Sequence, residues 1–437
     1  MRILKQPDLP LPPIPPGTPL KWSRWNDGIA MDDGSQVVFN TLHRSAVLMN
    51  ASEDANDHVI ALAALGMMVA SGKDELAEFE ADYEAAKRDM SYLDLTILTT
   101  TQCQMGCVYC FEGTKSKENL TDHAEQHILS FLESQKDTCR RLRITWFGGE
   151  PLLGYRRIKS LSAHLITFCH THGIHYSADI TTNGYALTAD RCNELVQALK
   201  VKRFIITLDG TAATHDKRRP LLSGEGSFSR IWENIHALVD AGAWVTIRMT
   251  IDRHNADSIP SFLNMIAASP LAHRVGLSFC RTVDIGFTSA SVRESLFTRQ
   301  EFADVEWRLI RHAHSLGLWR FSFPYAAPRG GCLRDGDIVI GANGEVYKCT
   351  DTIGDARWQT GDISAITHAG KPEWYSQWLH WMPSHSDTCR HCKLMPLCSG
   401  GCPHNALFEE KKHGSASQCP DWKDNYIRQI KALIPEL

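Results

Sequence analysis

The stretch "TQCQMGCVYCFEG", residues 101–113, places Cys103, Cys107 and Cys110 in one short segment. Its C-x3-C-x2-C spacing differs from the usual zinc pattern, in which two close cysteines are paired with two distant ligands. A four-iron cluster is also held by thiolates, and three protein thiolates leave one iron open to another ligand. The spacing therefore indicates an iron-sulfur cluster that binds a further molecule at its open iron.

Around this stretch, the composition is that of an ordinary globular protein. The chain has 437 residues, of which 43% are hydrophobic and 22% charged, enough for two or three domains. Its formal net charge of -4 does not indicate a nucleic-acid partner. There is no apolar run of about eighteen residues, and residues 1–17 lack the apolar core of a signal peptide. We therefore predict a cytoplasmic protein with no membrane partner.

Cysteine usage points to metal binding rather than to disulfides. The chain has fourteen cysteines, and the cytosol keeps thiols reduced. Ten of them fall into two groups. The first is the triad quoted above, and the second consists of Cys332, Cys349, Cys389, Cys392, Cys398, Cys402 and Cys419.

Between residues 92 and 280, short runs rich in β-branched residues alternate with longer amphipathic stretches. Strands are expected at residues 93–100, 142–148, 176–184, 203–210, 244–252 and 274–280. Helices are expected near residues 121–136, 155–172, 188–199, 227–241 and 257–267. Such β-then-α units predict an α/β fold with a parallel sheet, either doubly wound or a partial barrel. Active sites of these folds lie at the carboxyl ends of the strands, and the cysteine triad directly follows the first strand.

The regions before residue 92 and after about residue 320 have sequence patterns that differ from that of the central region. Before residue 92 we expect an extended proline-rich arm, a hairpin turning at residues 32–34, and helices near residues 42–49, 55–69 and 74–90. After about residue 320, short segments with glycine, tryptophan and cysteine are typical of a region held together by metal sites. The predicted domains are an α+β module at 1–91, a central domain at 92–320 and a cysteine-rich domain at 321–437.

The triad, with Tyr109 before its last cysteine, resembles the signature of radical S-adenosylmethionine (SAM) enzymes. The resemblance implies a partial (β/α)6 barrel, a 4Fe-4S cluster on Cys103, Cys107 and Cys110, and SAM chelated to its open iron. In that family an electron from the cluster cleaves SAM to methionine and a 5'-deoxyadenosyl radical. This radical then abstracts a hydrogen atom from the substrate.

Further motifs of the family follow in order, each after a predicted strand. "WFGGEP" resembles the segment that holds the SAM amino group, which implies that role for Gly148, Gly149 and Glu150. Glycine suits a backbone that must approach a ligand closely. "TTNG" is similar to a segment that faces the SAM ribose, here through Thr182 and Asn183. Asn183 could equally be part of a simple turn.

The fourth motif, "LDG" followed by "HDKRRP", resembles the stretch in which an arginine approaches the SAM carboxylate. This implies a SAM contact for Arg219 and a supporting place for Asp209. The simpler reading makes Asp209 the end of a strand and the arginines a solvated basic pair.

The second cysteine group resembles the seven-cysteine SPASM pattern, including Gly344 five residues before Cys349. That family implies two auxiliary 4Fe-4S clusters, and so three clusters in all. The distal cluster would be held by Cys389, Cys392, Cys398 and Cys419. The cluster nearer the substrate would be held by Cys332, Cys349 and Cys402, and "FPYAAPRGGC" offers no fourth cysteine. A zinc knuckle is the alternative for this region.

Radical SAM enzymes with SPASM domains mostly modify peptides or proteins, and residues 1–91 resemble the prefix of maturases for ribosomally synthesised peptides (RiPPs). The resemblance implies a precursor peptide or protein as substrate and an electron donor such as flavodoxin or ferredoxin. The prefix would recognise a leader peptide by strand addition, or would simply cap the barrel. The expected product is an intramolecular crosslink through a thioether, C–C or C–O bond.

Two alternatives remain open. Anaerobic sulfatase maturases, which form formylglycine, place an Asp base directly after the Gly-x4-Cys cysteine. Here Thr350 takes that position, and Asp351, one residue later, is the first catalytic candidate.

Cys280, at the end of the sixth strand, is a second catalytic candidate, because epimerisation needs a thiol to return a hydrogen atom. An alternative of another class is a metal-stabilised peptide-binding protein without catalysis, which would leave the triad and Gly148–Pro151 unexplained.

Overall fold

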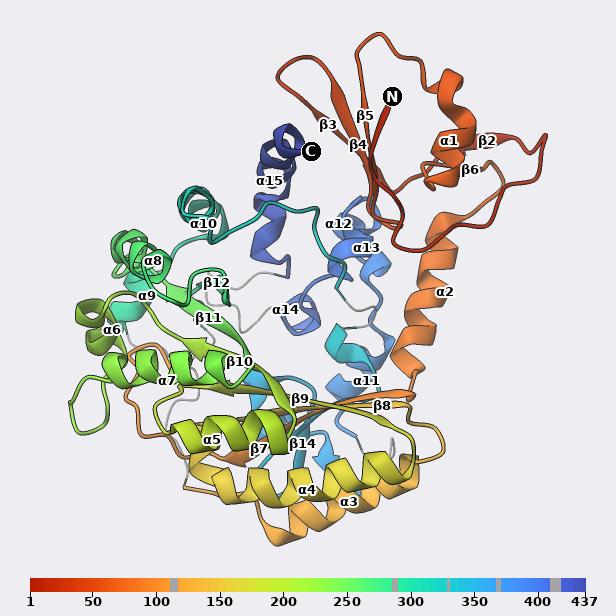
Figure 1. Ribbon diagram of the computed structural model, residues 1–437. Coiled ribbons are helices and arrows are strands. Elements are labelled where there is room, and N and C mark those ends of the chain that lie inside the picture. Colours follow the sequence, from red (N-terminus) through yellow and green to blue (C-terminus); the bar gives the residue numbers. More distant parts are fainter. Residues whose placement is uncertain (111–116, 285–289, 328–330, 367–370, 409–417) are drawn as a thin grey trace.

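The centre of the protein is a nine-stranded sheet (Figure 1) in the strand order β12-β11-β10-β9-β8-β7-β13-β14-β15. The computed structural model describes residues 1–110, 117–284, 290–327, 331–366, 371–408 and 418–437. No helix in these ranges is long and apolar enough to cross a membrane.

Six parallel strands stand next to one another in chain order. They are β7 (Tyr92–Thr100), β8 (Arg141–Gly148), β9 (His175–Thr182), β10 (Val201–Thr207), β11 (Trp244–Ile251) and β12 (Val275–Arg281). Within the described ranges β12 pairs only with β11, and β7 pairs with β8 and β13, so the sheet is open. Sequential order without reversal is that of a partial barrel, which confirms the predicted fold class over the doubly wound alternative.

Helices cover the outer face of these strands (Figure 1). They are α3 (Asp122–Gln135), α4 (Tyr155–Thr171), α5 (Ala189–Asn193), α6 (Ala212–Arg218), α7 (Phe228–Asp240), α8 (Ile259–Ala267), α9 (Ala290–Ser295) and α10 (Arg299–Ser315). The predicted helix at 188–199 is instead α5 followed by a π-helical turn at Glu194–Ala198.

Strand alternation decides which side chains reach the inside of the barrel. On β11 the apolar residues Val245, Ile247, Met249 and Ile251 are fully buried, and the residues between them are only partly buried. Since successive side chains point to opposite faces of a strand, the second set faces the interior. The same alternation on the neighbouring strands gives the interior its polar lining.

The N-terminal region forms a separate antiparallel sheet in the order β1-β5-β4-β3. Its strands are β1 (Arg2–Lys5), β3 (Asn26–Ala30), β4 (Gln36–Asn40) and β5 (Ser45–Met49), and β2 (Leu20–Trp22) pairs with β6 (Met68–Ala70) beside it. The predicted hairpin is confirmed: β3 and β4 pair around a turn in which Gly34 has φ +84°.

One helix prediction in this region is wrong, and another is confirmed over only part of its range. Residues 45–49 form β5 between β1 and β4, because Arg44 at φ +57° closes a tight turn and returns the chain to the sheet. The pattern at 55–69 gives only a 3-10 turn and α1 (Val59–Ala64), since Gly66 at φ +72° ends the helix. A short apolar run does not distinguish helix from strand.

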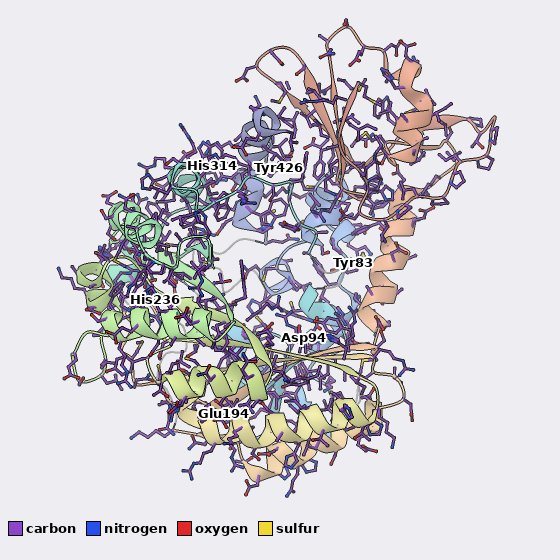
Figure 2. The ribbon with its side chains drawn as sticks, in the orientation of Figure 1. Tyr83, Asp94, Glu194, His236, His314 and Tyr426 are labelled. Atoms are coloured by element: carbon purple, nitrogen blue, oxygen red, sulfur yellow. The ribbon has the colours of Figure 1, made fainter. Side chains whose placement is uncertain are left out.

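The helix α2 (Glu75–Arg88), close to its predicted range, joins the N-terminal region to the cysteine-rich region. Phe79 and Tyr83 are buried in one cluster with Trp378, Trp381 and other apolar residues of the C-terminal part. Figure 2 shows Tyr83 beside α2, on the side that faces the C-terminal part. The Tyr83 hydroxyl donates to the Ser399 carbonyl at 3.2 Å. This helix therefore belongs to the core of the cysteine-rich region as much as to its own module.

Near the other end of α2, Lys87 is almost fully buried. Its Nζ donates to the carbonyls of Leu379 at 2.6 Å and Trp381 at 3.3 Å, and to Glu84 at 2.8 Å. A buried ammonium needs such partners, so Lys87 fixes the position of the 379–381 backbone.

The cysteine-rich region also continues the central sheet. Strand β13 (Asp337–Ile340) pairs in parallel with β7, and β14 (Glu345–Tyr347) and β15 (Gly361–Asp362) follow antiparallel. The short helices beyond them are α11 (Glu373–His380), α12 (Asp387–Arg390), α13 (Met395–Cys398), α14 (Pro403–Leu407) and α15 (Tyr426–Leu433). The turn after β14 carries Cys349 and Asp351 towards the barrel.

We predict that Phe79→Ala lowers the free energy of unfolding by about 3–5 kcal/mol, because it leaves a cavity in a packed core. Urea unfolding followed by tryptophan fluorescence would measure this, since Trp25, Trp378 and Trp381 lie in the same cluster. The exposed neighbour Glu78 provides the control, and Glu78→Ala should change stability by no more than about 0.5 kcal/mol. Equal effects of the two variants would contradict the packing described here.

Candidate active site

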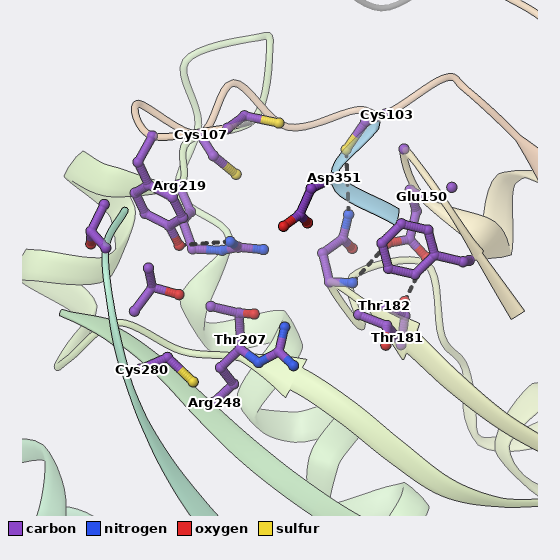
Figure 3. Close-up of a pocket in the computed structure, with 18 of the residues that line it drawn as sticks. Cys103, Cys107, Glu150, Thr181, Thr182, Thr207, Arg219, Arg248, Cys280 and Asp351 are labelled. Atoms are coloured by element: carbon purple, nitrogen blue, oxygen red, sulfur yellow. Dashed lines mark hydrogen bonds between the residues drawn. The ribbon is translucent and has the colours of Figure 1, made fainter. Parts of the chain in front are cut away.

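The cysteine triad and the predicted SAM contacts line one cavity of about 290 Å³ at the carboxyl ends of the strands (Figure 3). The structure brings together twelve of the predicted residues in its wall: Cys103, Cys107, Tyr109, Cys110, Gly148, Gly149, Glu150, Thr182, Asn183, Arg219, Cys280 and Asp351. Asp209 lies behind the wall, against Tyr109.

The cysteine loop is fastened to the segment that carries the arginines. Three backbone hydrogen bonds join them: Gly106 N to Pro220 O at 2.9 Å, Val108 N to Arg218 O at 3.0 Å and Leu222 N to Gln104 O at 2.9 Å. These bonds satisfy loop backbone that would otherwise be left without partners. The loop and the connection from α6 to α7 therefore form one wall of the cavity.

Gly148 and Gly149 are required by contacts within the chain. A Cβ on Gly148, which has φ +132°, would lie 2.1 Å from the Thr100 carbonyl oxygen, and one on Gly149 would lie 2.4 Å from that of Thr101. Gly149 N donates to Thr100 O at 3.0 Å. The two glycines therefore have a second reason to lack a side chain. They allow close approach of the backbone that leads into the cysteine loop, in addition to the ligand expected from the sequence.

Glu150 is a fully buried carboxylate at the end of this glycine segment. It accepts hydrogen bonds from Thr182 Oγ1 at 2.5 Å, Asn183 N at 2.7 Å and Leu152 N at 3.0 Å. Burial raises the pKa of Glu150, and the bonds from Thr182 and Asn183 oppose that rise. A buried carboxylate in a cavity wall with no cation within 4.0 Å in the described structure suits an ammonium group of a ligand.

Asn183 connects this carboxylate to the cysteine loop. Its side-chain Nδ2 lies 3.8 Å from Cys103 Sγ, and Gln104 Nε2 donates to its Oδ1 at 3.3 Å. Asn183 is therefore positioned by both the strand end and the loop, beyond the simple turn that its sequence allowed.

Tyr109, Asp209 and Arg219 form a buried network. The Tyr109 hydroxyl donates to Asp209, and Arg219 Nη1 donates to the same hydroxyl at 2.8 Å. Burial lowers the pKa of Arg219. The neighbouring Tyr109, Cys107 and Asp209 have a larger, opposite effect, so the pKa of Arg219 is raised well above its usual range. Burial raises the pKa of Asp209, although both neighbouring arginines act to lower it. Arg219 is thus a permanent cation in the wall, and not a solvated residue.

The adjacent Arg218 was missed in the sequence. Its guanidinium holds the Asp252 carboxylate at 2.8–2.9 Å and lies 5.0 Å from the centre of the Tyr109 ring. Since this arginine neutralises Asp252 and supports the ring, Arg219 is left to face the cavity. The "HDKRRP" stretch gave no signal to separate the two roles.

Strand interiors and the cysteine-rich region complete the lining. Thr181, Thr207, Arg248 and Thr250 line the same cavity as Cys280 and Asp351. Figure 3 shows Asp351 near Cys103 and Cys107, and Cys280 near Arg248. Loss of solvation in the cavity raises the pKa of Asp351, although the nearby His404 acts to lower it. Cys280 Sγ lies 3.3 Å from Ser278 Oγ. The threonines and Arg248 were missed, and only their alternation with buried positions could have revealed them.

The seven cysteines of the second group separate into two sets. Burial raises the pKa of Cys332 to about 12, and the nearby Cys402 adds to this rise. Burial also raises the pKa of Cys349 well above its usual range, and Asp351, Cys332 and Cys402 add to that rise. In the other set, burial raises the pKa of Cys389, with further rises from Cys419 and Cys392. These neighbours are the ones that the SPASM resemblance groups together, and the assignment of the two ligand sets stays a prediction.

The donor chemistry fits iron-sulfur clusters. Among the described residues, no three His, Cys, Asp or Glu side chains surround a point as the ligands of a single metal ion would. In a four-iron cluster each thiolate binds a different iron, so its cysteines stand around a volume and not a point. Gln418 Nε2 lies 3.4 Å from Cys389 Sγ and Lys423 Nζ 3.7 Å from Cys419 Sγ, as donors to cluster ligands would.

This parallel partial barrel, with a cysteine triad at the carboxyl ends of its strands, has the radical SAM α/β fold. Residues 97–266 match the family model described as Radical SAM superfamily. Residues 97–266 therefore form a radical SAM domain, and the fold of such domains implies a 4Fe-4S cluster and SAM as cofactors.

Relatives and solved structures extend the likeness beyond the barrel. The serine-type anaerobic sulfatase-maturating enzyme of Klebsiella aerogenes is 23% identical over 69% of this chain and 77% of that protein. The sporulation killing factor maturation protein SkfB of Bacillus subtilis is 25% identical over 51% of each chain. Streptococcus suis SuiB bound to its precursor peptide SuiA matches 92% of this chain and 99% of that chain with a TM-score of 0.53 at 12% identity. At that identity the structural match shows the fold alone.

We predict that Arg219→Lys weakens SAM binding about tenfold to a hundredfold, because it removes a charge-assisted fork worth about 1.5–3 kcal/mol. Calorimetric titration of SAM into the reconstituted protein would measure the change. Arg230→Lys is the matched control, because Arg230 lies outside the cavity, over the Tyr185 ring. Undiminished affinity in the Arg219 variant would remove this residue from the SAM site.

Proposed function

We propose that the protein is a peptide maturase that uses SAM to abstract a hydrogen atom from a ribosomal precursor peptide and forms an intramolecular crosslink. The observation that carries the proposal is the single cavity that joins the cysteine triad and Glu150 to Asp351 of the cysteine-rich region. A substrate in that cavity would meet the SAM site together with Asp351 and Cys280, which line the same space.

The SAM site would hold the cofactors. Cys103, Cys107 and Cys110 would bind a 4Fe-4S cluster, Glu150 the SAM amino group and Arg219 the SAM carboxylate, with Thr182 and Asn183 near the ribose. Bound SAM supplies a 5'-deoxyadenosyl radical that takes the hydrogen atom. Asp209 and Tyr109 would keep Arg219 in place through the buried network described above.

Asp351 and the cysteine-rich region would complete the crosslink. After the hydrogen atom has left, bond formation releases one proton and one electron from the peptide. Asp351 lies in the cavity wall and would accept the proton. The electron would leave through two auxiliary clusters, one on Cys332, Cys349 and Cys402 and the other on Cys389, Cys392, Cys398 and Cys419.

The N-terminal residues 1–91 would serve both of the roles considered for them. Burial of Phe79, Tyr83 and Lys87 against the cysteine-rich region supports a stabilising role. The strand β1 lies at the edge of its sheet with Ile3 44% exposed, which supports strand addition by a leader peptide. We propose the division 1–91, 92–320 and 321–437 on this basis.

Formylglycine formation is the second candidate, and one observation favours it. Although Asp351 is displaced by one residue from the position expected of a sulfatase maturase, its carboxylate still lines the cavity. The displacement alone therefore does not exclude a serine or cysteine side chain as substrate. Epimerisation is favoured in the same way by Cys280, which also lines the cavity.

We predict that Cys103→Ala, Cys107→Ala and Cys110→Ala together abolish formation of 5'-deoxyadenosine under dithionite reduction. These three thiolates would hold the cluster, and of the other described cysteines only Cys280 lines the same cavity. Liquid chromatography would quantify the product. The matched control replaces the buried cysteines Cys139, Cys169 and Cys192 by Ala. The control should keep cleaving SAM, and continued cleavage by the triad variant would defeat the assignment.

We predict that a short precursor encoded beside this gene loses two hydrogens on coexpression, with fragmentation suppressed between the linked residues. Oxidation of serine to formylglycine removes two hydrogens as well, so a hydrazide reagent that traps aldehydes must fail to react. Asp351→Asn should slow product formation about a hundredfold or more, since a positioned base typically contributes that much, whereas Cys280→Ala should still give product. Unchanged mass with deuterium uptake, lost in Cys280→Ala, would establish epimerisation instead.

A further inference from the structure

Basic side chains gather around Cys392, one of the cysteines proposed for the distal cluster. Arg390 and Lys393 flank it in the chain and are exposed, and Cys392 itself is only partly buried. The N-terminal module adds the exposed Lys21 and the half-buried Arg24. We call these four side chains the basic patch.

Hydrogen bonds bring the two parts of the patch together. Arg24 Nη2 donates to the Arg390 carbonyl at 2.7 Å, and the Thr41 hydroxyl donates to the carbonyl of Lys393. Lys21, Trp22 and Arg24 share the wall of a shallow depression. Figure 1 shows α12 and α13 beside the end of the N-terminal module. The patch is therefore a continuous surface built from segments that are far apart in the sequence.

The charges of the patch are not neutralised by the described part of the protein. None of the four basic side chains lies within 4.0 Å of a described carboxylate, and Arg390 donates only to the Ser384 carbonyl, at 3.0 Å. Two carboxylates that share the depression are hydrogen-bonded within the protein: Asp74 caps α2, and Glu75 accepts bonds from Ser23 and from Arg24 N. The exposed Asp387 lies on α12 three positions before Arg390 and forms no ion pair with it.

An exposed aromatic ring lies within the same surface. Trp22 is 42% exposed and sits in the depression between Lys21 and Arg24. Protein interfaces are enriched in Trp and Arg at their centres, and complementary charge at the rim accelerates encounter. An exposed ring flanked by Lys21 and Arg24 thus fits a protein partner with an acidic surface.

We propose that the basic patch docks an acidic one-electron carrier protein, of the flavodoxin or ferredoxin type, which exchanges an electron with the distal cluster. The proposal rests on the proposed function, since it needs that cluster on Cys389, Cys392, Cys398 and Cys419. The exchange makes and breaks no bond: the carrier loses one electron when the cluster gains one, and the reverse. Cys392 is the ligand nearest the patch in the chain, so docking here brings the carrier close to the cluster.

Other partners fit this surface less well. A nucleic acid would need a longer basic track, and the formal net charge of the protein is -4. A precursor peptide must reach the cavity between the triad and Asp351, whereas the patch surrounds a cysteine of the other set. A carrier protein needs only a small charged surface beside a redox centre, and such interfaces are at the low end of the size range.

Stopped-flow mixing of reduced flavodoxin with the reconstituted holoenzyme tests the proposal through the flavin absorbance. The test variant is Arg390→Glu with Lys393→Glu. Its matched control is Arg156→Glu with Lys202→Glu, two exposed cations on α4 and β10 that change the net charge equally. Iron content and dithionite-driven SAM cleavage are measured on all three proteins.

With the native protein the bimolecular rate should fall as salt rises, because steering between opposite charges is screened. In the test variant the rate of electron exchange should fall at least about tenfold and should depend little on salt. The control variant should have the same rate and salt dependence as the native protein. Dithionite-driven SAM cleavage should be the same in all three.

A rate in the test variant equal to that of the native protein, or an equal loss in the control, would overturn the docking surface while leaving the maturase proposal intact. So would a variant that exchanges electrons normally but processes a precursor peptide poorly under dithionite, which would identify the patch as a peptide site. Absence of SAM cleavage with dithionite in the native protein would instead count against the proposed function itself.

Discussion

The site depends on one close contact between two pieces of backbone. The end of β8 at Gly148 and Gly149 lies against the carbonyls of residues 100–102, so closely that a single added methyl group at either glycine would collide with them. This contact fixes where the chain leaves β7 for the cysteine loop and where Glu150 enters the barrel. The loop then bonds to residues 218–222, which carry Arg219. The cysteine triad, the carboxylate and the guanidinium are thus positioned by backbone hydrogen bonds within the chain.

Much of the barrel and most of the candidate site could be predicted, because both depend on local order. The six strands follow from β-branched runs, and Cys103, Glu150 and Asn183 each come directly after one of them. The helix expected at 42–49 failed because five apolar residues fit either structure, and only pairing with β1 and β4 decides between them. Strand β13 and the wall of Thr207 and Arg248 were missed because they depend on contacts between distant segments and on which face of a strand is turned inward.

Chemically similar side chains of the site have different roles, which depend on the partners that surround each of them. Arg218 and Arg219 are neighbours, yet one is matched by Asp252 and the other reaches the cavity, because the turn after α6 sends their side chains in different directions. Glu150 and Asp209 are both fully buried, but only Glu150 lines the cavity. A sequence records which residues are charged, whereas their partners determine which charges remain for a ligand.

The position of α2 has a consequence for how the protein is made. Its buried face meets residues that lie far along the chain: Lys87 binds the carbonyl of Leu379, 292 positions later, and Tyr83 that of Ser399, 316 positions later. During synthesis on the ribosome, Phe79 and Tyr83 therefore emerge long before their partners and must wait with an apolar surface exposed to solvent. Chaperones have this interval to cover the helix. Because the same partners frame the second cysteine group, assembly of the auxiliary clusters proposed there would belong to the last stage of biogenesis, after translation is almost complete.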